Sequence, residues 1–126
     1  MPAEAAVWVD VEGAVRAWAR EQALGVGERV FFGTNNATSD PQVVLHRVAG
    51  TDGDCLIQFD VWAATKAAAA AIAAAIATAA DALSRFTADG VLLHGAVVES
   101  VRWQPDEESD APRYVVEVTF TASAAA

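Results

Sequence analysis

Cysteine and histidine are scarce in this 126-residue sequence. Cys55 is the single cysteine, so no internal disulfide can form. It stands beside Leu56 and Ile57, a setting that predicts a small buried side chain. Neither His46 nor His94 has a second histidine, a cysteine or a carboxylate at metal-ligand spacing. The sequence thus predicts neither a disulfide framework nor a metal site, and it fits a reducing compartment.

Basic residues are also few. The chain has 17 acidic residues against 8 lysines and arginines, which gives a formal net charge of −9. A surface that binds nucleic acid through its phosphates is therefore not expected. The charge fits a soluble protein, or a surface that must not adhere to DNA.

Long runs of large apolar residues are missing. The apolar share of 54% is raised by alanine, above all in Ala67–Ala80, and Lys66 and Asp81 bracket that run. The run is too short for a membrane span, so we expect no membrane association. The start Met1–Glu4 is acidic and lacks the basic and apolar segments of a secretion signal, so none is expected.

Two helices are predicted from the spacing of apolar residues. The first follows Asp10, a residue type that caps helix N-termini, and runs over Val11–Leu24 until the glycines beyond it. The second is predicted over Thr65–Arg85 and consists mostly of alanine, the residue with the highest helix propensity. Its large apolar residues mark one face that should pack on a sheet: Ile72, Ile76 and Leu83.

Alternation of apolar and polar residues predicts strands in two groups. The first group, with an Asp-Gly turn within Ala49–Asp54, should form an antiparallel meander of Arg29–Phe32, Val43–Val48 and Cys55–Trp62. The second should form a hairpin of Val97–Trp103 and Tyr114–Thr121. Thr87–Gly90 is predicted as a turn, and Val91–Leu93 as either a short strand or a connection. Ser123–Ala126 is predicted as a frayed tail.

The order of elements predicts the fold class. Helix, three strands, long helix and two strands favour an α+β fold within a single domain over residues 1–126. The simplest two-layer arrangement is one twisted, mostly antiparallel sheet of about five strands with both helices packed on one face. A chain of this size can bury enough surface for a core without disulfides or metal.

No pattern of catalytic residues is found in the sequence. Asp52-Gly53-Asp54 lacks the further ligands of a calcium loop, because Cys55–Ile57 follow at once. The glycine pair Gly25 and Gly27 precedes a strand, whereas a dinucleotide fingerprint would follow one. We therefore predict no catalytic residue, no cofactor and no metal. Sequence spacing does not exclude an active site formed by residues that are distant in sequence.

Two polar loops are the candidate assembly elements. The loop Thr34–Pro41 has no apolar anchor, so we expect a neighbouring molecule to order it. The loop Gln104–Pro112 is an acidic hairpin tip, which a solvated surface loop would also explain. Assembly roles are predicted for the polar residues of both loops: Asn35, Asn36, Asp40, Asp106, Glu107, Glu108 and Asp110.

Taken in order, the predicted elements are similar to one known family. They are the first helix, then Glu28–Gly33, Pro41–Val48 and Ile57–Ala63, the alanine-rich helix, and Tyr114–Thr121. The chain resembles the tail terminator family of long-tailed bacteriophages, also called tail-completion or tail-to-head joining proteins. The strand Gln58–Trp62, which leads into the alanine-rich helix, is the most specific part of the resemblance. That helix is richer in alanine than is expected for the family.

The resemblance implies a structural protein and not an enzyme. It implies a homo-oligomeric ring, usually a hexamer, that caps the completed tail tube and joins it to the head. The major tail tube protein and head–tail connector proteins would be its partners, and DNA would pass through the centre without specific binding. The protein would be assembled in the cytoplasm of the host bacterium and would end at the head-proximal end of the virion tail. The alternative is a small bacterial α+β ligand-binding module or enzyme with a pocket between sheet and helices.

Overall fold

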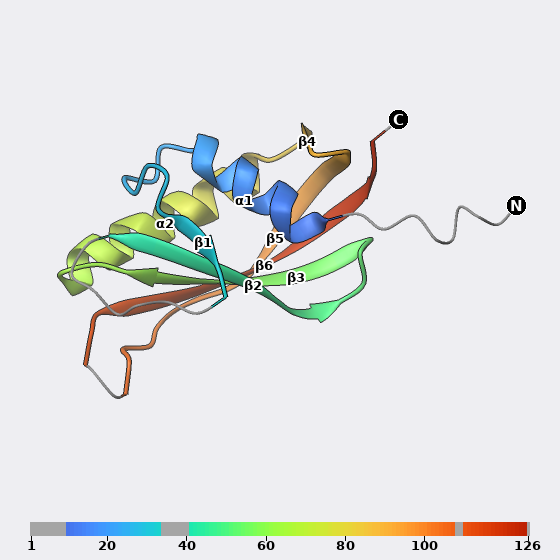
Figure 1. Ribbon diagram of the computed structural model, residues 1–126. Coiled ribbons are helices and arrows are strands. Elements are labelled where there is room, and N and C mark those ends of the chain that lie inside the picture. The colour runs from blue at the N-terminus through green and yellow to red at the C-terminus, as the bar shows by residue number, and fades with distance from the viewer. Residues whose placement is uncertain (1–9, 34–40, 108–109, 126) are drawn as a thin grey trace, which may run out of the picture.

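The computed structural model describes residues 10–33, 41–107 and 110–125. Two helices and six strands follow one another along the chain (Figure 1). In order they are α1 Val11–Glu21, β1 Val30–Phe32, β2 Gln42–Gly50, β3 Asp54–Trp62, α2 Lys66–Ala82, β4 Phe86–Ala88, β5 Val91–Trp103 and β6 Arg113–Ala124.

The strands form a single sheet in the order β1-β2-β3-β6-β5-β4. β1 lies parallel to β2, and every other neighbouring pair is antiparallel. Both helices lie on the same side of the sheet (Figure 1). The predicted α+β fold with one mostly antiparallel sheet and two helices on one face is therefore confirmed in outline.

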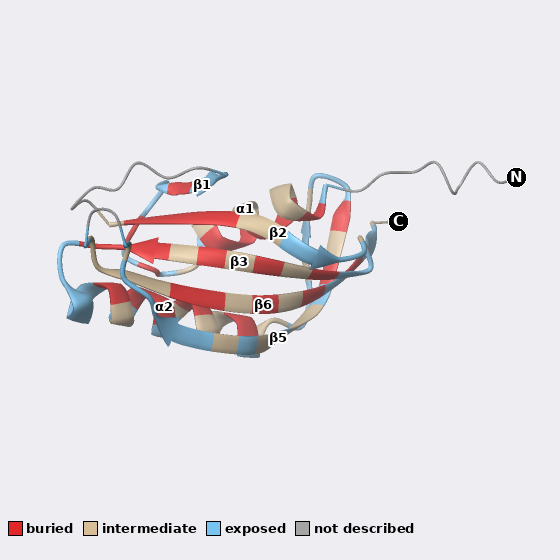
Figure 2. Ribbon diagram, turned by 90° about the horizontal axis from the view of Figure 1, so that it is seen from below, coloured by how far each residue is buried: buried red, intermediate tan, exposed pale blue. Residues whose placement is uncertain are grey.

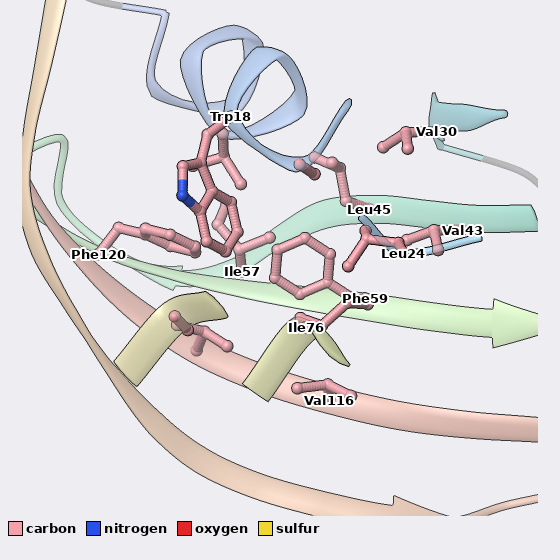
Figure 3. Packing of buried hydrophobic residues seen from close by; sticks show 14 of the residues in the cluster. Trp18, Leu24, Val30, Val43, Leu45, Ile57, Phe59, Ile76, Val116 and Phe120 are labelled. Carbon is pink, nitrogen blue, oxygen red and sulfur yellow. The ribbon is translucent and has the colours of Figure 1, made fainter. Parts of the chain in front are cut away.

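The core fills the space between the helices and the sheet. Trp18 of α1 meets Phe120 of β6 edge-on at 5.5 Å between ring centroids, and Phe59 of β3 meets the same ring at 6.2 Å. Ile76 of α2 approaches from the other helix (Figure 3). Along the central strands, buried residues alternate with more exposed ones (Figure 2), because successive side chains point to opposite faces.

α1 begins as predicted but ends earlier. The Asp10 carboxylate accepts a hydrogen bond from Gly13 N–H at 2.9 Å, which caps the helix. The last helical residue is Glu21 and not Leu24. Gln22 turns to an extended backbone, and its side-chain amide donates to the Trp18 carbonyl at 3.0 Å in place of a further turn.

α2 spans Lys66–Ala82, within the predicted Thr65–Arg85. Thr65 Oγ1 caps it by accepting from Ala68 N–H at 3.1 Å. The predicted apolar face is confirmed for Ile72 and Ile76, which are buried together with alanines of the same face. Leu83 lies just past the helix end and is only partly buried.

The antiparallel meander predicted for the first three strands is wrong in one place, because β1 runs parallel to β2. Apolar alternation carries no information on strand direction. β1 has only three residues, so the connection to β2 has to return only about 10 Å to begin a parallel strand. The β2–β3 turn is a hairpin as expected, closed by Thr51 N–H donating to the Asp54 carbonyl at 2.9 Å.

The second group of strands is longer than predicted. β5 begins at Val91, so the ambiguous segment Val91–Leu93 is strand. Of the predicted turn Thr87–Gly90, Thr87 and Ala88 belong to β4, which raises the strand count to six, whereas Asp89 and Gly90 form a turn as predicted. β6 continues through Ser123 and Ala124, so the predicted frayed tail is wrong for these two residues. A strand of three residues such as β4 is too short to show alternation.

Candidate assembly surfaces

The acidic hairpin joins β5 to β6. Gln104 N–H donates to the Arg113 carbonyl at 3.0 Å, and the Arg113 side chain returns a hydrogen bond to the Gln104 carbonyl at 2.8 Å. Asp106 N–H donates to the Ala111 carbonyl, so the predicted tip residues Asp106, Glu107 and Asp110 come together beyond the strand ends. A pocket of about 350 Å³ lies beside them, lined by Gln104, Pro105, Asp106, Glu107 and Arg113.

The remaining predicted assembly residues lie outside the described part of the chain. These are Asn35, Asn36 and Asp40 of the first polar loop, and Glu108 of the hairpin. Their assembly roles stay predictions.

A larger pocket of about 420 Å³ lies between the start of α1 and the strands β1 and β2. Its lining combines acids, a histidine, an arginine and apolar residues: Asp10, Glu12, Phe32, Gly33, Leu45, His46 and Arg47. This is the pocket that a ligand-binding module or enzyme would use.

Two charged residues of that pocket, Glu12 and Arg47, are paired with each other. Arg47 donates to Glu12 at 2.9 Å and to Asp52 at 2.7 Å, so one guanidinium ties α1 to the β2–β3 turn. The bond to Asp52, supported by Glu12, raises the pKa of Arg47 above its ordinary range. Burial raises the pKa of the nearby Cys55 thiol, which keeps it protonated and unreactive. This arrangement resembles a structural clamp more than a reactive centre.

The sheet face away from the helices bears a polar network. Arg102 donates to Glu117 at 2.9 Å, and Ser100 donates to the same carboxylate at 2.9 Å. These bonds, with Arg102 the larger contributor, hold the pKa of Glu117 below its ordinary value. The network covers the β5–β6 pair with paired charges, which suits a solvated face.

Exposed apolar side chains gather on the edge strand β1 and on β5, which β4 covers only over Val91–Leu93. Five of the six large exposed apolar residues lie on β1 or β5: Phe31, Phe32, Val97, Val101 and Trp103. Figure 2 shows exposed residues on both strands. Sequence reasoning missed this surface. A signal was present in Phe31-Phe32, because adjacent residues of a strand point to opposite faces and both cannot enter one core.

Two further properties concern the described residues alone. No group of three or more His, Cys, Asp or Glu side chains in them could hold a metal ion. None of the helices in this part of the chain has the length and hydropathy needed to cross a bilayer.

Comparison with known proteins gives a structural likeness alone. No protein-family model matches the chain. No curated protein matches it either. Among solved structures, it is similar to a chain of one described as "Virion of native gene transfer agent (GTA) particle", with a TM-score of 0.67 and 20% sequence identity. The match covers 91% of this chain and 98% of that chain, so the two share their fold over nearly their full lengths.

Proposed function

We propose that this protein is a structural virion protein of a long-tailed phage or phage-like particle, and specifically a tail terminator. In this role it forms a ring, with a hexamer as the expected form, that caps the completed tail tube and joins it to the head. DNA passes through the centre without specific binding. The partners are further copies of the chain, the major tail tube protein and the head–tail connector proteins.

The single observation that supports this proposal most is the fold shared with a gene transfer agent virion chain over 91% of the sequence. The order of elements that resembles the tail terminator family is independent support, because it comes from the sequence. The ion pairs of Arg47 with Glu12 and Asp52, beside the pocket between α1 and β2, favour the structural role over catalysis.

The alternative is a small ligand-binding module or enzyme, and the pocket between α1 and β2 is the observation that favours it. A binding site of this kind usually presents convergent polar groups to its ligand. Here Arg47, the cation of the pocket, is already bound by Glu12 and Asp52. A screen that finds a small molecule bound through Arg47, with the ion pairs broken, would favour this alternative.

A tail-completion assay tests the proposal. Tails assembled without a terminator are mixed with the purified protein and with heads, and joined particles are counted by electron microscopy. We expect annular density at the head-proximal end of the tube and a large rise in joined particles. Tails that stay uncapped and unjoined at saturating protein would reject the tail terminator role.

A further inference from the structure

We propose that the two edges of the sheet are the two halves of one self-association interface. The outer side of β5 in one copy receives β1 of a neighbouring copy, head to tail. The occupant is a second copy of this chain, and the contact centres on Val101–Trp103 of one copy and Val30–Phe32 of the next. The inference deepens the proposed ring and rests on it for its biological setting, while the contact itself is argued from the sheet alone.

The outer side of β5 is open. Within the described residues, β4 pairs with β5 only over Val91–Leu93, which leaves residues 94–103 without a strand neighbour on that side. Gln104 N–H bonds to β6, and in an antiparallel ladder alternate residues direct their backbone groups to the same neighbour. The backbone groups of Val101 and Trp103 therefore point to the open side.

β1 and the end of β5 lie at the same level of the sheet. The pairing register connects them residue by residue through Val30, Val43, Val61, Tyr114 and Trp103. The parallel rows connect Phe31 with Arg102 and Phe32 with Val101. A neighbouring copy that continues the sheet at this level therefore places its three-residue β1 directly against Val101–Trp103.

The directions of the two strands also match. β1, β2 and β6 run in one direction, and β3 and β5 run in the opposite direction. β5 of one copy and β1 of the next therefore run antiparallel, an arrangement that allows backbone hydrogen bonds. Arg20 already donates to the Val30 carbonyl at 3.0 Å, so the contact rests on side chains more than on a full ladder.

The side chains that would meet on the helix side of the sheet are apolar and exposed. Phe32 is 43% exposed on one edge, and Val101 is 44% exposed and Trp103 37% on the other. Phe31, 40% exposed, points to the opposite face and lies level with Arg102. Aromatic residues of this kind dominate the energetics of protein interfaces. Cations already lie on two of these rings, with Arg16 4.7 Å from the centroid of Phe32 and Lys66 4.9 Å from that of Trp103.

The two edges carry opposite charges at the same end of the sheet. The acidic tip with Asp106, Glu107 and Asp110 follows β5. Arg20 and Arg29 lie beside the start of β1, where Glu28 is 3.8 Å from Arg20. In the proposed contact, Arg29 of one copy comes to the level of Gln104 and the acidic tip of the next. This complementarity lets copies that each have a net charge of −9 approach in one orientation.

Two unlike edges define the symmetry of the contact. In a head-to-tail contact, β5 of one copy binds β1 of the next. The first copy of a row keeps its β1 free and the last copy keeps its β5 free, so further copies add until the assembly closes. A ring or a helical row follows, and an isolated two-fold dimer does not.

Disulfide trapping tests the contact. In a Cys55→Ala background, Phe32→Cys and Val101→Cys are made as separate proteins, mixed in equal amounts and mildly oxidised. Facing residues of neighbouring strands are close enough for a disulfide. Val97→Cys replaces Val101→Cys in the matched control, because Val97 is even more exposed, at 61%, yet lies level with Thr119 and Leu56, beyond the reach of β1.

We expect about tenfold or more linked dimer in the 32–101 mixture than in the 32–97 control, because only the former pair is held at high effective concentration. Equal yields from the two mixtures, or no linked product in either, would overturn the contact. The Val101→Cys protein alone is also oxidised. A higher yield of linked dimer there than in the 32–101 mixture would overturn the contact, because it would show β5 pairing with β5.

A chain that bears both Phe32→Cys and Val101→Cys tests the head-to-tail geometry. On a non-reducing gel it should give a ladder of linked copies that ends at the closed ring, whereas the mixture of single variants stops at dimers. A double variant that also stops at dimers would overturn the head-to-tail arrangement. Both readouts need no tails, so a failed tail-completion assay with a positive ladder would reject the terminator role and leave this interface standing.

Discussion

At the scale of single residues, Arg47 joins parts of the fold that are distant in sequence. Its guanidinium contacts Glu12 at the start of α1 and Asp52 in the β2–β3 turn. The sequence showed Arg47 only as a charged residue on a strand. The two carboxylates are separated from it by 35 and 5 positions, and only folding brings them together.

Arg47→Met should therefore destabilise the protein by about 1–3 kcal/mol, because two part-buried carboxylates lose a charged hydrogen-bond donor. Urea unfolding followed by circular dichroism measures the change. Glu12→Gln is the matched control and should cost less, because Arg47 keeps Asp52. An Arg47→Met variant as stable as the wild type would show that the clamp contributes nothing.

Glu117 gives a prediction with a defined pH dependence. Hydrogen bonds from Arg102 and Ser100 lower the pKa of Glu117 from its ordinary value of 4.5, so the folded state favours the ionised form. Because the folded pKa lies below the unfolded one, this stabilisation is complete above about pH 4.5 and is lost as the pH falls through the folded pKa. The stability advantage of the wild type over Glu117→Gln should shrink between pH 7 and pH 3. An advantage that grows on acidification would contradict the assigned direction.

At the scale of elements, α2 shows how small side chains place a helix on a sheet. Alanines on the buried face let the helix approach closely, and Ile72 and Ile76 fill the remaining space. Ile76 is fully buried, and it packs in the same cluster as Phe59 and Val116 (Figure 3). The sequence predicted this face correctly because helical periodicity is a local property.

Ile76→Ala should cost roughly 2–4 kcal/mol of unfolding free energy, the usual range for a buried large-to-small change. Thermal and urea unfolding measure it. Ala74→Ser, on the exposed face of the same helix, is the matched control and should change stability by less than about 0.5 kcal/mol. A loss below that control level for Ile76→Ala would mean that the helix does not pack through this side chain.

At the scale of the whole molecule, the net charge of −9 bears on the proposed passage of DNA. A conduit should not bind the phosphates of its cargo. We expect no measurable DNA binding by the wild type in a gel-shift or anisotropy assay at about 0.1 M salt, where screening acts over about 10 Å. Tight, salt-sensitive binding would contradict the conduit and favour a nucleic-acid-binding module.

The acidic hairpin permits a stronger form of this test. Replacing Asp106, Glu107, Glu108 and Asp110 with lysine should leave the fold intact, because the described residues of the tip, Asp106, Glu107 and Asp110, lie beyond the strand ends and outside the hydrophobic core. If the tip reaches the lumen, the variant should cap tails but deliver DNA poorly. Normal DNA delivery by correctly capped particles would place the tip elsewhere.

The sequence by itself determined the local elements of this protein. Both helices, the strands from Val43 to Trp62 and the last hairpin follow from apolar spacing, caps and turn residues, which act over a few positions. The acidic tip was likewise predictable, because a run of carboxylates between two strands has to remain in solvent.

Only the tertiary structure decided how these elements combine. The parallel direction of β1, the added strand β4 and the open side of β5 depend on which strands become neighbours, and periodicity is the same for either direction and either edge. The same holds for the alignment of Phe32 with Val101, which passes through three intervening strands. Residues far apart in the chain acquire a common level only when hydrogen bonding sets the register of the whole sheet.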